Sequence, residues 1–193
     1  MKTLFAAFLA LAVLALALDA PPAAADGAYG KSLVIVFSQT GNTMRLAKLI
    51  AAKTGSDIYS IEPLEPMPTD EKALIEMEEA RKNEGKRPSL KSPPPDLTGY
   101  DLIFLGAPTW FGDRPDLVGV FLEAADFKGA KLAVFSSAGT RPGQTLDTLK
   151  SQPKNATPLA PTLLQARADD QSDQAVEKKV DDYLAQVAAA LKP

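Results

Sequence analysis

Short apolar runs alternate with helical patterns from residue 33 onward, and this alternation restricts the possible folds more than any other feature of the sequence. The run 33–37 is continuously apolar and rich in β-branched residues, which is typical of a strand buried on both faces. Further strands are expected at 57–61, 102–105, 131–135 and 157–165. Because such alternation produces parallel strands with helices on both faces, the sequence predicts an α/β fold with a doubly wound, five-stranded parallel sheet.

The segment after the last expected strand has the clearest helical spacing. Its apolar residues recur at steps of three or four and would dock one stripe on the sheet: Val176, Val180, Tyr183, Val187 and Leu191. Thr69 is expected to cap an earlier helix. Pro158 and Pro161 fall in the last strand and suit the edge of a sheet. The sequence has no internal repeat and no second compositional zone, so residues 26–193 are predicted to form a single domain.

The N-terminal segment has the features of an export signal. Lys2 precedes the apolar run 4–18, and three alanines at 23–25 offer a cleavage site before Asp26. The run is short for a membrane span, although an uncleaved N-terminal anchor is the alternative. We therefore expect a signal peptide at 1–25, cleavage near Ala25, a periplasmic or secreted location, and no stable membrane insertion of the mature domain.

The sequence contains no Cys and no His. Thiol nucleophiles, Ser-His-Asp triads and zinc sites built on imidazole or thiolate all require these residues, so we expect no catalytic side chain and no metal site. Any reaction would then depend on a borrowed cofactor. The 21 basic and 24 acidic residues give a formal charge of -3, which offers no surface for nucleic acid.

The segment 38–43 lies between the first expected strand and its helix, and it is the strongest candidate for a ligand site. It consists of small hydroxyl, amide and glycine residues: Ser38, Gln39, Thr40, Gly41, Asn42 and Thr43. A helix N-terminus presents unpaired N–H groups and a partial positive charge, which suits a single phosphate even without Lys or Arg in the segment. The alternative is that Asn42 or Thr43 only caps the helix.

Two further loops are expected at the same edge, because parallel strands end on one side of a sheet. The first contains the only Trp, in the order Pro108, Thr109, Trp110, Phe111 and Gly112. Its aromatic pair could stack on a flat heterocycle, or both rings could fold back over the sheet. The second loop contains Ser137, Ala138 and Gly139, which could present main-chain groups to a ring edge or form an ordinary connection.

The strand, the segment 38–43 and the following helix together resemble the phosphate loop of flavodoxins. The stretches 100–110, 121–123 and 127–131 resemble the third strand, its loop and the approach to the fourth strand in a flavodoxin-like branch. The resemblance extends over about residues 31 to 166 and implies the strand order 2-1-3-4-5 and FMN as cofactor.

The resemblance also implies a role for each candidate. Ser38, Thr40, Gly41, Asn42 and Thr43 would bind the FMN phosphate. Pro108, Thr109 and Trp110 would flank the isoalloxazine ring, with Trp110 stacked on it, and Ser137, Ala138 and Gly139 would contact the ring from the other loop. The last loop lacks the aromatic residue of better-known flavodoxins. Either Phe111 supplies the second stacking surface, or one face of the ring stays open.

These implications favour an exported electron-transfer protein whose partner is a redox protein or a small quinone-like acceptor. An FMN-dependent quinone or flavin reductase, an oxidoreductase in the strict sense, would use the same site, so carrier and enzyme remain alternatives. A chain exported unfolded would have to find FMN outside the cytoplasm, so a flavodoxin-fold binding or interaction module without flavin is a third possibility. A hydrolase acting through Ser136 or Ser137 would lack a His to activate the hydroxyl.

Overall fold

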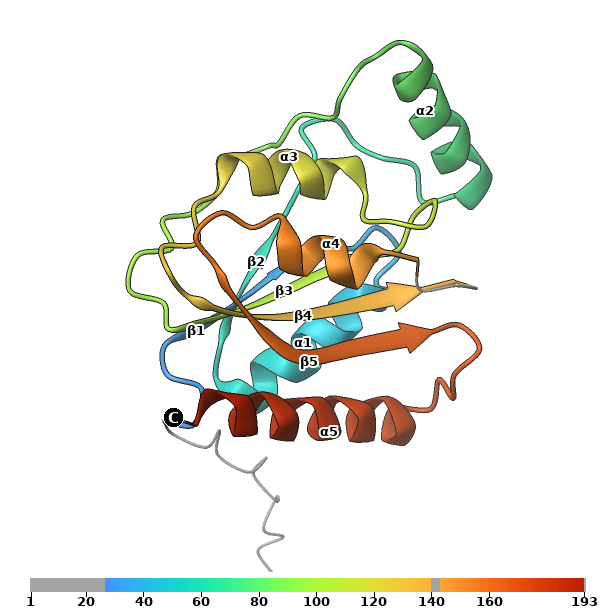
Figure 1. Cartoon of the computed structure of the whole chain (residues 1–193). Helices are drawn as coiled ribbons and strands as arrows, with labels where there is room; N and C mark the ends of the chain where they lie inside the picture. Colours follow the sequence, from blue (N-terminus) through green and yellow to red (C-terminus); the bar gives the residue numbers. More distant parts are fainter. Residues whose placement is uncertain (1–26, 140–142, 193) are drawn as a thin grey trace, which may run out of the picture.

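The computed structural model describes residues 27–139 and 143–192. Its strands form one parallel sheet in the order β2-β1-β3-β4-β5, which confirms the predicted fold and strand order (Figure 1). The strands are β1 (Ser32–Val36), β2 (Asp57–Ser60), β3 (Leu102–Pro108), β4 (Lys131–Ala138) and β5 (Thr157–Ala166). The expected signal peptide at 1–25 lies outside the described residues.

Helices cover both faces of the sheet, as predicted. Helices α1 and α5 lie on one face, and α3 and α4 lie on the other (Figure 1). The helices are α1 (Asn42–Thr54), α2 (Glu71–Asn83), α3 (Asp116–Ala124), α4 (Thr145–Ser151) and α5 (Asp173–Leu191). None of the helices found in residues 27–139 and 143–192 has both the length and the apolar character needed to cross a membrane.

The apolar run Leu33–Val36 within β1 follows from the position of this strand inside the sheet. Val34 and Val36 pack into the core formed with α1 and α5, whereas Leu33 and Ile35 pack into the core on the side of α3 and α4. Side chains alternate between the two faces of a strand, so a strand covered on both faces needs apolar residues at every position.

Strand β5 lies at one edge of the sheet, where its prolines are tolerated. The pairing with β4 shifts in register between Leu132, which lies opposite Pro158, and Val134, which lies opposite Thr162. Because proline cannot donate a main-chain hydrogen bond, an edge strand with an irregular register accommodates Pro158 and Pro161 without breaking the sheet.

Helix α2 stands away from the sheet, beyond α3 (Figure 1). Leu74 is its only buried residue within the described chain. The N-cap is Asp70 and not Thr69 as expected, because the Asp70 carboxylate accepts a hydrogen bond from the main-chain N–H of Ala73 at 2.9 Å. The segment before α2 is tied to the first loop, since the Gln39 side-chain amide donates to the carbonyl of Met67 at 2.8 Å.

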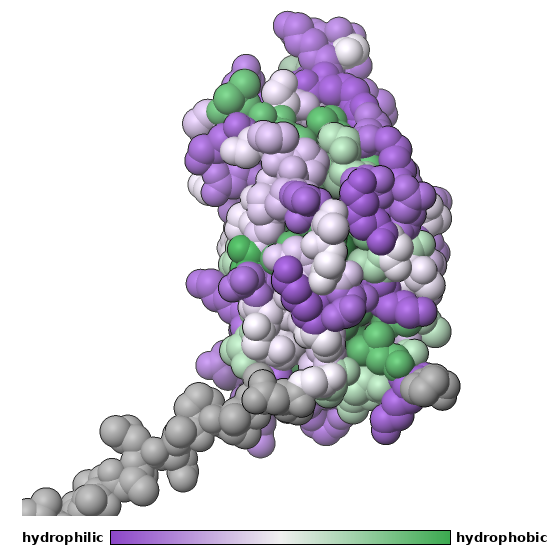
Figure 2. Space-filling view, turned by 90° about the vertical axis from the view of Figure 1, so that its left-hand side faces the viewer, coloured by the Kyte–Doolittle hydropathy of each residue, from purple (hydrophilic) through white to green (hydrophobic). Residues whose placement is uncertain are grey.

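The two ends of the sheet carry different parts of the chain. Figure 2 views the molecule from the end where the strands begin, and hydrophobic residues there are interspersed among hydrophilic ones. The loops that follow β1, β3 and β4 gather at the opposite end, where the strand arrows point in Figure 1. The candidate site residues lie at this second end.

Candidate functional site

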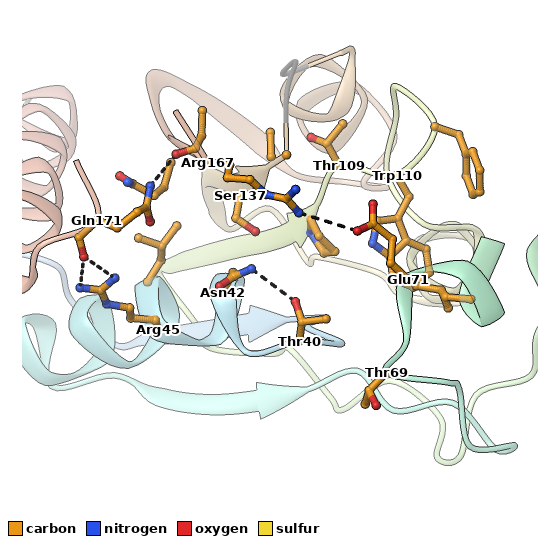
Figure 3. A pocket seen from close by; sticks show the side chains of 18 of the residues that line it. Thr40, Asn42, Arg45, Thr69, Glu71, Thr109, Trp110, Ser137, Arg167 and Gln171 are labelled. Atoms are coloured by element: carbon orange, nitrogen blue, oxygen red, sulfur yellow. Dashed lines mark hydrogen bonds and ion pairs between the residues drawn. The ribbon is translucent and has the colours of Figure 1, made fainter. Parts of the chain in front are cut away.

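A cavity of about 510 Å³ opens where the strands end (Figure 3). Its walls come from the loops after β1, β3 and β4, from the start of α2, and from the connection between β5 and α5. Ligand sites in proteins commonly measure roughly 300–1,000 Å³, so the volume is sufficient for a small cofactor.

The structure brings most of the predicted site residues into one wall of this cavity. Those that line it are Thr40, Asn42, Pro108, Thr109, Trp110, Phe111, Ser137, Ala138 and Gly139. The remaining candidates, Ser38, Gln39, Gly41, Thr43 and Gly112, lie in the same loops but do not border the cavity. The three loops that the sequence indicated therefore do meet.

Helix α1 begins without a side-chain cap. Its N-cap is Gly41, whose φ of 89° belongs to the left-handed region that glycine adopts readily, and glycine has no side chain that could cap the helix. Asn42 and Thr43 are already inside the helix, so neither is the cap. Asn42 donates only a long hydrogen bond of 3.4 Å to the Thr40 hydroxyl (Figure 3). Within residues 27–139 and 143–192, no capping side chain occupies the main-chain N–H groups at this helix terminus, as an anion site requires.

Two residues of the first loop brace it from behind. The Thr43 hydroxyl lies 2.7 Å from the Ser137 hydroxyl, and the side chains are 1% and 8% exposed. Gln39 donates to the carbonyls of Met67 and Pro68, at 2.8 and 2.9 Å. Thr43 therefore joins the start of α1 to the end of β4, and Gln39 joins the loop to the segment before α2.

The aromatic loop after β3 is a tight turn. Trp110 and Asp113 exchange main-chain hydrogen bonds of 2.7 and 3.0 Å. Between them, Phe111 and Gly112 have φ values of 51° and 83°, a pattern typical of a type I′ turn. Trp110 packs edge to face on Phe37, with ring centroids 5.4 Å apart, whereas Phe111 is 69% exposed. Only Trp110 folds back on the sheet, so the alternative in which both rings do so is wrong.

Hydroxyl groups and a close contact fix the loops after β3 and β4 relative to each other. The buried Ser136 hydroxyl donates to the carbonyl of Ala107 at 2.8 Å, and Thr145 donates to the Thr109 hydroxyl at 2.8 Å. Gly106 on β3 lies under the Phe135 ring, where a Cβ would come within 2.1 Å of a ring carbon. The two loops are therefore held by rigid neighbours, as a preorganised binding site requires.

The sequence did not identify the wall contributed by α2 and by the connection from β5 to α5. The residues there include Glu71 on α2, Gln165 near the end of β5, and Arg167 and Gln171 in the connection. Arg45 on α1 also lines the cavity and was not indicated as a site residue by the sequence. A signal did exist for part of this wall, because the end of β5 must lie on the same sheet edge as the other strand ends. The start of α2 carried no such signal, since its position depends on a helix that leaves the sheet.

Two of the arginines that the structure describes border the cavity, although the first loop itself contains none. The Arg167 guanidinium reaches across to Glu71, with 4.0 Å between the charged atoms (Figure 3). The side chains of Arg167 and Glu71 are 75% and 78% exposed. An exposed ion pair of this kind contributes little to stability, about 0–1 kcal/mol. Arg45 is held by the Gln171 carbonyl at 3.1 Å and by Asp173. Of these two arginines, Arg167 is more available to an anionic ligand, because its ion pair with Glu71 is long and Glu71 is exposed.

The β5–α5 connection that carries Arg167 is anchored by Asp169. Its carboxylate accepts hydrogen bonds from the main-chain N–H of Ala166 at 2.7 Å and from the Lys179 ammonium at 2.6 Å. The bond from Lys179, followed by that from Ala166, lowers the pKa of the Asp169 carboxyl. The charged form of Asp169 is therefore the one that holds this wall of the cavity in place.

One polar atom in the wall has no partner. Gln165 is 6% exposed and lines the cavity, and its side-chain oxygen makes no hydrogen bond within the described part of the chain. A buried acceptor without a partner is unusual in a folded protein. The wall also combines an indole ring with hydroxyl groups and an open helix N-terminus. The indole ring and the helix N-terminus fit a ligand that has a flat ring and a phosphate, both of which FMN contains.

Comparison with known proteins identifies the family of this chain. A family model described as flavodoxin matches residues 31–182. The chain belongs to the flavodoxin family. This result confirms the resemblance inferred from the segment 38–43 and the aromatic loop.

Individual flavodoxins and flavoproteins show the same relationship. Flavodoxin 1 from Salmonella typhimurium is 30% identical over 103 residues, which cover 51% of this chain and 44% of that protein. The chain thus spans less than half the length of that relative in the match. The structure of oxidised Flavodoxin 1 from Bacillus cereus superposes on this structure with a TM-score of 0.50 at 25% identity. The match covers 81% of this chain and 97% of the Bacillus cereus chain. A flavoprotein from Lactobacillus acidophilus, solved in complex with FMN, has the same fold, with a TM-score of 0.62 at 16% identity over 80% and 99% of the two chains.

Proposed function

We propose that this chain binds FMN in the cavity at the strand ends and serves in electron transfer. One observation carries the proposal: a single cavity is bordered by the uncapped start of α1 and by the indole of Trp110. A helix N-terminus favours a phosphate, and an aromatic face favours a flat ring. The family supports the choice of FMN, and the same fold holds FMN in the Lactobacillus acidophilus flavoprotein.

Different residues of the cavity bind different parts of FMN in this proposal. Main-chain N–H groups of the first turn of α1, with Thr40 and Asn42, hold the phosphate. Trp110 covers one face of the ring, and the loop from Ser137 to Gly139 presents main-chain groups to the ring edge. Bound FMN supplies reversible uptake and release of electrons, so no side chain is required as an acid or base.

The charge of the protein bears on the direction of electron flow. A formal charge of -3 disfavours additional negative charge at the site, which lowers the reduction potential of a bound ring. The protein would then act as a reductant or carrier, and its partner would be a redox protein or a small quinone-like acceptor. A quinone or flavin reductase remains the alternative use of the same cavity, because both roles need the same cofactor site.

We also propose that the domain works outside the cytoplasm. Lys2, the apolar run 4–18 and the alanines at 23–25 support a cleaved export signal. The N-terminal sequence of protein isolated from a periplasmic extract tests this point directly. An N-terminus at Asp26 is expected, whereas intact residues 1–25 in a membrane fraction would contradict it. A flavin absorption spectrum in the same extract would separate an FMN protein from a module without flavin.

Titration with three flavins tests the cofactor assignment. Apo protein covering residues 26–193 is mixed with FMN, riboflavin or FAD, and quenching of flavin fluorescence gives each dissociation constant. We expect FMN to bind more tightly than riboflavin, because only FMN places a terminal phosphate at α1. The double substitution Thr40→Ala and Asn42→Ala should narrow this difference.

Thr69→Ala is the matched control, since Thr69 also lines the cavity but lies before α2 (Figure 3). This variant should keep the preference for FMN over riboflavin. Equal affinities of the wild-type protein for FMN and riboflavin would refute the phosphate site.

A further inference from the structure

Helix α2 belongs to a flap, residues 65–88, that leaves the sheet and returns to it through a narrow neck. At the neck, the main-chain N–H of Leu64 donates to the carbonyl of Ser89 at 2.8 Å, and that of Lys91 donates to the carbonyl of Glu62 at 2.9 Å. The residues between them form an antiparallel bridge. A segment joined to the sheet only through such a neck can move as a unit while the sheet stays in place.

The flap is also attached close to each of its ends. Near its start, the Gln39 side chain of the first loop donates to the carbonyl of Met67 at 2.8 Å. Near its end, the Arg87 guanidinium forms ion pairs of 2.7 Å with Asp116 and 2.8 Å with Glu123, both on α3. The part of the flap that lies between these attachments is α2.

Few contacts hold α2 itself to the rest of the molecule. Leu74 is the only described residue of this helix that is buried, and it belongs to neither of the two cores that cover the sheet. Leu74 and Ile75 line the cavity instead. Among the described residues, the hydrogen bonds and ion pairs of α2 stay within the flap, except for the ion pair of Glu71 with Arg167.

The ion pair between Glu71 and Arg167 lies at the rim of the cavity. Both residues line the cavity, and their side chains are 78% and 75% exposed, so the pair faces solvent. It joins α2 on one side to the β5–α5 connection on the other, with 4.0 Å between the charged atoms (Figure 3). Because a long and exposed ion pair is weak, this link between the two walls breaks and forms again readily.

We propose that α2 is a hinged gate over the flavin cavity and that the ion pair of Glu71 with Arg167 is its latch. When the latch breaks, α2 turns about the neck and widens the mouth of the cavity. Entry and release of the ligand both require the open gate, so each rate is proportional to the fraction of time for which the gate is open. This inference rests on the proposed function, and it concerns the passage of the flavin and not the contacts that hold it.

Glu71→Gln tests the latch, because it removes the charge and keeps the size of the side chain. Apo protein covering residues 26–193 is mixed rapidly with FMN or riboflavin, and the quenching of flavin fluorescence gives the rate of entry. Displacement of the bound flavin gives the rate of release. Both rates should rise by about two- to fivefold, the factor that corresponds to one exposed ion pair, and the dissociation constant should stay the same.

Two controls accompany this variant. Riboflavin carries no phosphate, so an effect of the Glu71 charge on the phosphate alone would change the rates of FMN and leave those of riboflavin as they are. Asp182→Asn removes the exposed ion pair of Asp182 with Lys178, at 2.6 Å on α5 and away from the cavity. This variant should exchange both flavins at the rates of the wild type.

A cross-link across the rim tests the gate in the opposite direction. The sequence contains no Cys, so Glu71→Cys with Arg167→Cys supplies a single pair of thiols that a reducible bifunctional reagent can join. The joined protein should neither take up nor release flavin within the time in which the same protein, once reduced, reaches equilibrium. Lys178→Cys with Asp182→Cys, joined by the same reagent, is the matched control and should exchange flavin freely.

The outcomes distinguish this inference from the proposed function. Unchanged rates in Glu71→Gln, a change confined to FMN, or free exchange in the protein joined across the rim overturns the gate, while binding of FMN by the wild type leaves the proposed function in place. Faster release without faster entry indicates a damaged site and also overturns the gate. Failure of the wild type to bind either flavin overturns both proposals.

Discussion

The buried hydroxyl pair of Thr43 and Ser137 can be tested by removing one partner at a time. The two oxygens are 2.7 Å apart, and the side chains are almost fully buried. Thr43→Val keeps the shape of the side chain but leaves the Ser137 hydroxyl without this partner, and Ser137→Ala does the reverse. Removing one partner of a buried pair lowers the free energy of unfolding by about 1–3 kcal/mol, because the remaining hydroxyl is buried away from water and has no hydrogen bond in exchange.

The same structure predicts that the two losses are not additive. The double variant, Thr43→Val with Ser137→Ala, leaves neither hydroxyl unpaired, so its total cost should be smaller than the sum of the single costs. Urea unfolding of the four apo proteins gives this double-mutant cycle. In thermal unfolding, a loss of about 2 kcal/mol corresponds to a fall of roughly 4–8 °C for a domain of this size.

The stability cycle, together with flavin titration of the Thr43→Val variant, decides between two roles of Thr43. The flavodoxin resemblance implies that Thr43 binds the phosphate, whereas the structure bonds its hydroxyl to Ser137. If the hydroxyl mainly braces the loop, Thr43→Val lowers stability but preserves the preference of the protein for FMN over riboflavin. Additive costs in the cycle, or single variants as stable as the wild type, would refute the reasoning about this pair.

Two further predictions concern the ring and acid stability. Trp110→Ala should weaken FMN, riboflavin and FAD alike, by about 1–3 kcal/mol, because stacking does not depend on the tail; calorimetric titration measures this, and a loss confined to FMN would contradict the role of Trp110. Hydrogen bonds from Asn155 and from Lys128 lower the pKa of the Asp126 carboxyl to about 2. Since this pKa is below its value of 3.8 for the free side chain, the stability that Asp126 contributes is present above about pH 4 and is lost as the pH falls towards 2. Asp126→Asn should reduce the change in urea midpoint over this interval, and an unchanged acid dependence would disprove the assignment.

The sheet could be predicted from the sequence because a strand buried on both faces requires a continuous run of apolar residues, which is visible in the sequence. Every position of β1 is buried and all but Ser32 are apolar, and α5 carries a complete apolar stripe. The prolines of β5 also identified its edge position correctly. Helix α2 was harder to place, because its only described buried residue is Leu74 and most of its surface resembles any solvated helix.

The cavity was predictable to the extent that neighbouring residues in sequence form it. Thr40 and Trp110 were identified because unusual loop compositions follow predicted strands. Gln165 and Arg167 were missed because their importance comes from what they face across the sheet edge. An unmet hydrogen bond on Gln165 and a long ion pair on Arg167 are properties of three-dimensional packing, and no local pattern encodes them.

The contact between Gly106 and Phe135 has a consequence for how relatives of this chain can diverge. A methyl group at position 106 would overlap the Phe135 ring, with 2.1 Å between the carbons. Any evolutionary path that enlarges residue 106 must therefore first, or at the same time, shrink residue 135. The two positions are expected to covary among homologues as a volume-compensating pair. Drift at either site is then constrained by the other, even though neither residue lines the cavity.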